Sequence, residues 1–393
     1  MYKKILIALM NQGVVGLISY VLNIVLVTKM SANDYGVYTY IISISTLISG
    51  LFVSGTMTQL SEVKKYYRQR FDKKINLMAA HSYHIVALIF LLLLIVASYI
   101  FTNIAMLPMI LLVTYALVCR EIIFIFLFWE RNKYGIALLG LTSFIVPSYI
   151  IWKSEHIKLN YSLVIFAINN IGFILTLLYF ILIVKIDYSS VIKLNIISIK
   201  NGGYTILSNL ISFSRGNVYN YLVPIFFTFS ELAELNIAKL FLTPLLMLIP
   251  PINNLYVSSF NSVSQIHKIY SIEYIYTIIF FFYAIALLIF KNEVYQIINV
   301  NNFDNFNYFV ILWLLYGYVY LIRSSFETKF FIDNNKKLIF IVNLYGFLQI
   351  TIGLLIIGNF IQLKYMLVFM IITEIMMSVF ILNYNRIYGY IKK

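Results

Sequence analysis

Long apolar segments, separated by short polar loops, follow one another along the whole chain. Each apolar segment has about twenty residues or more, which is the length of helix needed to cross a hydrocarbon core ~30 Å thick. No polar block between them is long enough to form a separate soluble domain. We predict twelve membrane-spanning helices, with these bounds: Leu6–Thr28, Val37–Ser61, Leu77–Phe101, Ala105–Phe128, Tyr134–Trp152, Tyr161–Val184, Gly203–Phe229, Ala233–Ser258, Ile272–Phe290, Phe306–Ser325, Leu338–Ile357 and Tyr365–Tyr384.

The loop charges indicate how these helices are oriented. With an even number of spans both termini lie on one side, and the loops on that side contain 20 Lys and Arg residues against 5 on the other. Loops rich in Lys and Arg stay in the cytoplasm, so both termini are predicted to be cytoplasmic. The most basic loop, Glu62–Asn76, is interpreted as a topology anchor on anionic lipid, with substrate docking as the alternative.

The composition supports a membrane protein. Hydrophobic residues make up 62% of the chain and charged residues 11%, whereas soluble domains are about one-quarter charged. We attribute the net charge of +14 to orientation and to anionic lipid headgroups rather than to nucleic acid. Because the N-terminal apolar segment has no small-residue cleavage site, we expect a retained span. The single Cys119 and four scattered His residues give no disulfide or metal cluster, and we expect no cofactor.

The order of loops and charges repeats in the two halves of the chain. The loop Glu62–Asn76 after the second predicted span corresponds to Ser259–Glu273 after the eighth, at an offset of 197 residues. Since six spans is an even number, the halves share an orientation and are related by an axis along the membrane normal. We therefore predict an all-α polytopic membrane protein with two six-helix bundles, residues 1–197 and 198–393.

A short motif between the first two spans, Ser-Ala-Asn-Asp-Tyr-Gly-Val-Tyr from Ser31 to Tyr38, resembles the Gly-x-Tyr opening of Wzx-type polysaccharide flippases. The segment Ala233–Lys239 is similar to that family's second copy of the motif, although Ala233 and Leu235 replace the usual Gly and Tyr. The turn Asp333–Lys337 also resembles the family. These flippases share a superfamily with the MATE drug exporters and the lipid II flippases.

The resemblance implies a fold of two six-helix bundles that form a V, and rocking-type alternating access. It also implies a substrate: an undecaprenyl-diphosphate-linked oligosaccharide, moved from the cytoplasmic to the periplasmic leaflet for O-antigen-type surface polysaccharide. The partners would be this lipid-linked glycan, the bilayer and other membrane proteins of polysaccharide assembly, in the bacterial cytoplasmic membrane. Coupling to protons or sodium is left open.

Three alternatives to this flippase were weighed against the sequence. A cation-coupled multidrug exporter of the same superfamily typically has an acidic residue in its first helix, and Leu6–Thr28 has none. A membrane polysaccharide polymerase or acyltransferase usually has a large periplasmic loop, and the longest one here, Lys291–Asn305, is too short. The fourteen-span lipid II flippases fit twelve spans less well. We therefore expect a transporter rather than an enzyme.

Charged residues inside the predicted spans are the first candidates for a substrate site, because an ionised group at membrane depth costs at least about 2.5–3.5 kcal/mol. The polar span around Asn201–Phe229 contains Arg215, roughly 18 Å from the start of its helix at about 1.5 Å per residue. Its guanidinium suits a diphosphate. The alternative is a structural ion pair, with Glu374 as the most plausible partner. Glu374 alone in a cavity would instead carry a proton.

Other charged residues have a second interpretation as well. Lys239 is expected to snorkel outward from the periplasmic end of its span, with a cavity role as the alternative. Adjacent on one helix, Arg120 and Glu121 point about 100° apart, so we expect no pairing between them and one of them in the cavity. Arg323 and Glu327 are interpreted as a pair at headgroup level.

Asparagine side chains inside the predicted spans are the remaining candidates for the substrate site. They would bind sugar hydroxyls, or hold helices together at about 0.6 kcal/mol per contact. Asn253 and Asn254 follow a double proline that should break the eighth span, and a break at this depth favours a cavity-lining role. The asparagine candidates are Asn169, Asn170, Asn209, Asn217, Asn253 and Asn254.

Overall fold

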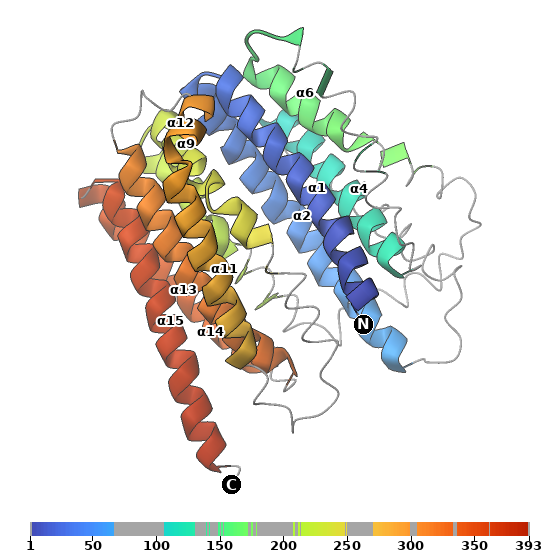
Figure 1. Cartoon of the computed structure of the whole chain (residues 1–393). Coiled ribbons are helices and arrows are strands. Elements are labelled where there is room, and N and C mark those ends of the chain that lie inside the picture. The colour runs from blue at the N-terminus through green and yellow to red at the C-terminus, as the bar shows by residue number, and fades with distance from the viewer. Residues whose placement is uncertain are drawn as a thin grey trace. The chain divides into compact units, whose positions relative to one another are not determined.

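The computed structural model describes residues 2–66, 106–129, 139, 141, 148–149, 151, 153–171, 174–175, 178, 207–208, 211–212, 214–247, 249, 270–298, 305–332, 336–360 and 362–391. All regular secondary structure in these residues is helical (Figure 1). The prediction of an all-α protein is therefore confirmed.

The helices follow the predicted spans closely where both are described. They are α1 (Tyr2–Lys29), α2 (Ala32–Tyr66), α4 (Leu107–Trp129), α6 (Leu159–Asn169), α9 (Phe229–Leu240), α11 (Tyr270–Ile289), α12 (Lys291–Ile298), α13 (Phe306–Ile332), α14 (Lys336–Phe360) and α15 (Lys364–Ile391). A further helical segment, residues 214–226, precedes α9. The third predicted span, Leu77–Phe101, lies outside the described residues, as does most of the fifth, Tyr134–Trp152.

Three helical stretches of the described residues are long and apolar enough to cross a membrane. They are Phe306–Glu327 in α13, Leu338–Ile356 in α14 and Lys364–Asn383 in α15. Shorter apolar stretches are Gly16–Lys29 in α1 and Glu273–Ile289 in α11. The short helix α12 was predicted only as a periplasmic loop.

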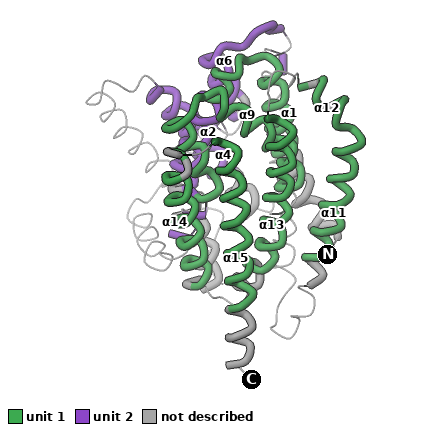
Figure 2. Tube along the Cα trace, turned by 90° about the vertical axis from the view of Figure 1, so that its left-hand side faces the viewer, with its two compact units in different colours: residues 1–36, 215–393 green, residues 37–214 purple. Residues whose placement is uncertain are grey.

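The chain divides into two compact units, coloured separately in Figure 2. Unit 1 comprises residues 1–36 and 215–393, and unit 2 comprises residues 37–214. In unit 2, α4 packs against α6, and the Ser45 hydroxyl of α2 donates to the Ile110 carbonyl of α4 at 3.1 Å. The predicted bundle boundary between residues 197 and 198 lies outside the described residues and stays a prediction.

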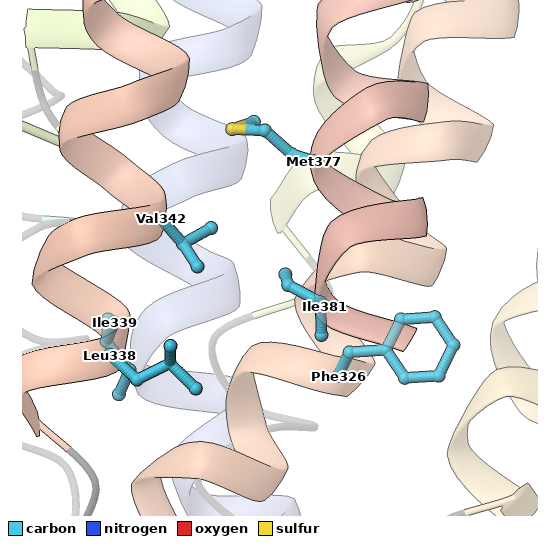
Figure 3. Close-up of a cluster of buried hydrophobic side chains, with 6 residues drawn as sticks. All are labelled: Phe326, Leu338, Ile339, Val342, Met377 and Ile381. Carbon is cyan, nitrogen blue, oxygen red and sulfur yellow. The ribbon is translucent and has the colours of Figure 1, made fainter. Parts of the chain in front are cut away.

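Helix α13 is the central helix of unit 1, because it packs against α9, α11, α14 and α15. One buried apolar cluster joins α13, α14 and α15 (Figure 3), and its members are Phe326, Leu338, Ile339, Val342, Met377 and Ile381. Gly346 lets α14 approach its neighbours closely, since a Cβ there would collide with the Met377 sulfur and lie 3.3 Å from Arg215 Cδ. This close packing brings polar side chains of different helices together.

Helix α9 ends earlier than predicted. The eighth span was expected to continue from Ala233 to Ser258 and to break at the double proline, which lies outside the described residues. Instead α9 stops at Leu240, a turn follows at Phe241 and Leu242, and residues 243–247 and 249 are helical again. The physical reason is Pro244, which has no N–H for the Leu240 carbonyl and whose ring would clash with it. The Tyr283 hydroxyl donates to the Phe241 carbonyl in this turn.

The Gly-x-Tyr motif contacts the start of α9 within unit 1. A Cβ on Gly36 would overlap the Phe229 carbonyl oxygen, so the backbones meet here without a side chain between them. Phe229 is the first residue of α9 and precedes the segment that resembles the second copy of the motif. Gly36 of the first copy is therefore required by packing against Phe229, at the start of the helix that contains the second copy.

Candidate functional site

Two polar sites lie inside unit 1. The first is an Arg–Glu cluster, which we define as Arg215, Arg323, Glu327 and Glu374. Glu374 of α15 is fully buried, and its Oε2 accepts a hydrogen bond from Arg323 Nε at 2.5 Å. Its Oε1 accepts from the Tyr316 hydroxyl at 3.3 Å and lies 3.7 Å from Arg215 Nε. One carboxylate thus lies between two guanidinium groups.

Arg215 reaches this cluster from the segment 214–226 and is 2% exposed. Its Nη1 donates to Asn343 Oδ1 of α14 at 2.8 Å and lies 3.5 Å from the sulfur of Met377 on α15. The structure therefore contains the Arg215–Glu374 pair that the sequence offered as the alternative to a diphosphate site. Four helical segments meet at the cluster.

The expectation that Arg323 lies at headgroup level stays a prediction, and the structure adds how the side chain is held within unit 1. Its side chain is completely buried, and it pairs with Glu327 one turn later on α13 as well as with Glu374. Helix α13 continues to Ile332, so Arg323 lies inside the helix and within its apolar stretch Phe306–Glu327. The predicted pairing of Arg323 with Glu327 is confirmed.

The Arg–Glu cluster balances its own charges, with two arginines and two glutamates. Buried charges are tolerated when they are paired and hydrogen-bonded. Two of the donors still have no acceptor among the described residues: Arg215 Nε and Arg323 Nη2. The cluster as a whole has no excess charge with which to hold an anionic substrate.

The second site surrounds Lys239 of α9, and we call it the Lys239 site: Lys239, Tyr219, Asn220, Asn236 and Trp313. The ammonium donates to the Tyr219 hydroxyl at 2.8 Å, and it lies 4.9 Å from the centre of the Tyr219 ring and 5.2 Å from that of Trp313. Lys239 forms no ion pair within the described part of the chain. The side chain points to aromatic rings of unit 1, whereas the sequence suggested that it would snorkel outward.

Hydrogen bonds fix the aromatic side of this site. The Tyr219 hydroxyl donates to Asn236 Oδ1 at 3.0 Å, and Asn236 Nδ2 donates to Asn220 Oδ1 at 2.9 Å. Trp313 Nε1 donates to the Leu235 carbonyl at 2.9 Å, and its ring meets that of Tyr219 edge-on at 5.3 Å. Because Tyr219 and Trp313 are each 1% exposed, they form a fixed wall beneath the ammonium.

The two sites share helices. Tyr219 follows Arg215 by four residues on the segment 214–226, which places both on one helix face. On α13 the ring of Trp313 contacts that of Tyr316 at 5.3 Å, and Tyr316 in turn donates to Glu374. A continuous series of polar and aromatic side chains therefore connects Lys239 with Glu374.

Arg120 and Glu121 lie in unit 2, on α4, and they do pair. Arg120 Nη2 donates to Glu121 Oε1 at 3.2 Å, with side chains that are 21% and 37% exposed. The prediction that Arg120 and Glu121 would not pair is wrong. Neighbouring side chains leave a helix about 100° apart, but these two are long enough to bend towards each other.

The asparagine candidates are only partly described. Asn170 is buried, and its Nδ2 donates to the carbonyl of Phe166 four residues earlier at 2.8 Å. This amide is used within its own segment. Asn217 is half-buried on the segment 214–226, and Asn169 ends α6. The side chain of Asn169 and the residues Asn209, Asn253 and Asn254 lie outside what the structure describes.

Sequence reasoning did not select Tyr219, Trp313, Tyr316, Asn236 or Asn343. Tyrosine is frequent throughout the chain and also concentrates at membrane interfaces, so no single tyrosine could be selected. The spacing of four between Arg215 and Tyr219 is the signal that was present in the sequence. Asn343 and Trp313 are brought in by packing between helices distant in sequence, which spacing does not reveal.

No family model and no curated protein sequence matches the chain. Several solved structures, in contrast, match the chain. An inward-facing multidrug resistance MATE family transporter of the MOP superfamily has a TM-score of 0.61 at 13% identity, covering 95% of this chain and 94% of that one. An outward-facing structure of such a transporter has a TM-score of 0.60 at 12% identity, covering 98% and 95%.

A third solved structure comes from Pyrococcus furiosus. It is a MOP superfamily transporter whose binding pocket has reverse polarity, which is said to suggest a different function. Its TM-score is 0.55 at 12% identity, and the match covers 99% of this chain and 92% of that one. The matches extend over nearly the full length on both sides. The chain therefore has the fold of the MATE transporters of the MOP superfamily.

Proposed function

We propose that the protein is a membrane transporter that moves an undecaprenyl-diphosphate-linked oligosaccharide from the cytoplasmic to the periplasmic leaflet of the bacterial inner membrane. It works by alternating access and supplies repeat units for O-antigen-type surface polysaccharide. The MOP-type fold supports transport, and the resemblance of Ser31–Tyr38 to the flippase motif supports the substrate.

The observation that carries this proposal is the Lys239 ammonium, which forms no ion pair within the described residues. Burying a cation is unfavourable unless it is paired or hydrogen-bonded, and Lys239 is half-buried against the rings of Tyr219 and Trp313. One hydrogen bond contributes about 1 kcal/mol, and cation–π contacts contribute roughly 0.5–2 kcal/mol. An anionic substrate group would accept hydrogen bonds from the remaining donors, because an ammonium has three and Tyr219 takes one.

Arg215, in contrast, is already neutralised by Glu374, so Lys239 is the better candidate for the diphosphate. We therefore assign substrate binding to Lys239 and helix positioning to the Arg–Glu cluster. Asn217 and the undescribed asparagines remain candidates for contacts with the sugars.

A multidrug exporter is the second candidate, and it is favoured by the multidrug resistance MATE transporters among the matching structures. Such exporters of the superfamily typically have an acid in the first helix. Helix α1 contains none, and the Lys239 ammonium, which no described carboxylate neutralises, would repel a cationic drug. The transporter of reverse polarity supports the idea that this fold serves more than one class of substrate.

Deletion of the gene separates the two functions. The proposal predicts that lipid-linked repeat units accumulate on the cytoplasmic side, that surface polysaccharide is lost, and that sensitivity to cationic drugs is unchanged. The wild-type gene should restore export and Lys239→Gln should not, although the variant protein accumulates in the membrane. Normal polysaccharide together with drug sensitivity in the deletion strain would favour the exporter.

A further inference from the structure

The carboxylate of Glu374 is shared unequally by two arginines. It is hydrogen-bonded to Arg323 Nε at 2.5 Å, whereas Arg215 Nε lies at 3.7 Å, beyond hydrogen-bond distance. Both arginines keep a buried donor without an acceptor in the described part of the chain, Nε of Arg215 and Nη2 of Arg323. A buried charged donor without an acceptor is unfavourable, so the present arrangement leaves Arg215 incompletely satisfied.

A second arrangement would satisfy Arg215 instead. If the carboxylate moved the short distance towards Arg215, Nε of this residue would gain a charged hydrogen bond and Arg323 would lose one. Arg323 would still hold a carboxylate, because Glu327 pairs with its Nη1 from the same helix. Arg215 has no second carboxylate within the described residues. Glu327 is therefore what allows Glu374 to leave Arg323 without stranding a buried cation.

The exchange would change which helices are held together. Glu374 is on α15, Arg323 is on α13, and Arg215 is the first residue of unit 1 after residue 214, on the segment 214–226. In the present arrangement the short bond ties α15 to α13. In the second arrangement, the hydrogen bond of Glu374 would tie α15 to the segment 214–226, which also contains Tyr219 of the Lys239 site. A charge network with these two arrangements would be a bistable element, of the kind that switches between conformations in other proteins.

We propose that Glu374 exchanges between Arg323 and Arg215 as the transporter changes conformation, and that Glu327 makes this exchange possible. This inference rests on the proposed function in assuming a transport cycle, and it adds the element that switches. It also gives distinct parts to the two arginines: Arg323 holds the carboxylate in one state and Arg215 in the other.

The test measures the distance between two spin labels in a protein with Cys119→Ser. Ile225 of the segment 214–226 and Ile372 of α15 are 66% and 45% exposed, so a label at each is accommodated at the surface. Both positions lie in unit 1. We expect two distance populations in lipid nanodiscs, one for each partner of Glu374.

Two variants should shift these populations in opposite directions. Glu327→Gln leaves Arg323 dependent on Glu374 and should reduce the Arg215-bound population about tenfold, the effect of one charged hydrogen bond. Arg323→Lys removes the Nε donor and should enrich that population. Glu121→Gln, which removes a carboxylate from the Arg120 pair of unit 2, is the matched control and should leave the ratio unchanged.

A single distance in the wild type that Glu327→Gln does not change would overturn the proposal, and so would a shift of both variants in the same direction. If Arg323→Lys fails to fold, the Glu327→Gln variant alone tests the exchange. Its replacement is the better tolerated, because the Glu327 side chain is more exposed than that of Arg323. The distances do not depend on which substrate is transported. If the flippase assignment is wrong, two distance populations are therefore still expected. If the exchange of Glu374 is absent, the flippase assignment is likewise unaffected.

Discussion

Arg215 and Tyr219 lie one turn apart on the same helix face, yet their side chains belong to two different sites. Arg215 enters the Arg–Glu cluster at Glu374, and Tyr219 accepts the hydrogen bond of Lys239. A movement of this one segment would therefore affect both the Arg–Glu cluster and the Lys239 ammonium, which forms no ion pair with any described residue. The segment 214–226 therefore connects the Arg–Glu cluster, which holds the helices together, with the Lys239 site, which is the candidate substrate site.

Arg215→Ala should destabilise the protein rather than only stop transport. Removing one partner of a buried ion pair costs about 3–5 kcal/mol, and the variant removes the hydrogen bond to Asn343 and the ion pair with Glu374. We expect a lower thermal unfolding midpoint and less protein in the membrane. Full accumulation with complete loss of transport would instead return Arg215 to the role of a diphosphate ligand.

Lys239→Gln should abolish anion binding at the Lys239 site, and Trp313 can report it. In a protein with Trp129→Phe and Trp152→Phe, Trp313 is the remaining tryptophan, and its ring lies beside the ammonium. Pyrophosphate should change its fluorescence saturably. The change should disappear in Lys239→Gln and persist in Lys291→Gln, which removes another lysine that lies over a tyrosine ring. An unchanged response in Lys239→Gln would place the anion elsewhere.

Tyr219→Phe tests the hydrogen bonds beneath the ammonium while keeping the ring. The hydroxyl bonds both Lys239 and Asn236, and each hydrogen bond contributes about 0.5–1.5 kcal/mol. We expect pyrophosphate affinity to fall roughly threefold to tenfold in the same fluorescence titration. Equal affinity in Tyr219→Phe and the wild type would show that the hydroxyl does not position Lys239.

Gly36→Ala should destabilise unit 1, because its Cβ would overlap the Phe229 carbonyl. Overpacking of this kind costs about 1–3 kcal/mol. The control is Gly216→Ala, where a Cβ meets no atom of the described chain within 4 Å and the helical position should gain about 0.5–1 kcal/mol. Thermal unfolding of the two variants should shift in opposite directions. A stabilised Gly36→Ala protein would contradict the packing explanation of the motif.

The helices were predictable because apolar runs of membrane-spanning length are a strong signal, and α14 and α15 begin within a few residues of their predicted spans. Hydropathy does not show turns inside an apolar run, so the end of α9 at Leu240 was missed although Pro244 stands in the sequence. The charged residues themselves were also visible, since few ionised groups occur inside the spans.

Partners across helices were harder to predict. The sequence suggested Glu374 as a partner for Arg215, but it could not show that Arg323 competes for the same carboxylate, because Arg323 was placed near a helix end. Nor could it show that Lys239 turns to Trp313, which lies on a different helix. Such contacts depend on how helices pack, and this information is not contained in the spacing along one segment.

The most direct test of the central proposal is flipping by the purified protein in lipid vesicles containing an undecaprenyl-diphosphate-linked oligosaccharide. The measured quantity is the fraction of glycan that becomes accessible to an enzyme outside the vesicles. We predict that the wild type and Lys291→Gln raise this fraction equally and that Lys239→Gln leaves it at the level of protein-free vesicles. No flipping by the wild type, or equal flipping by Lys239→Gln, would contradict the proposal.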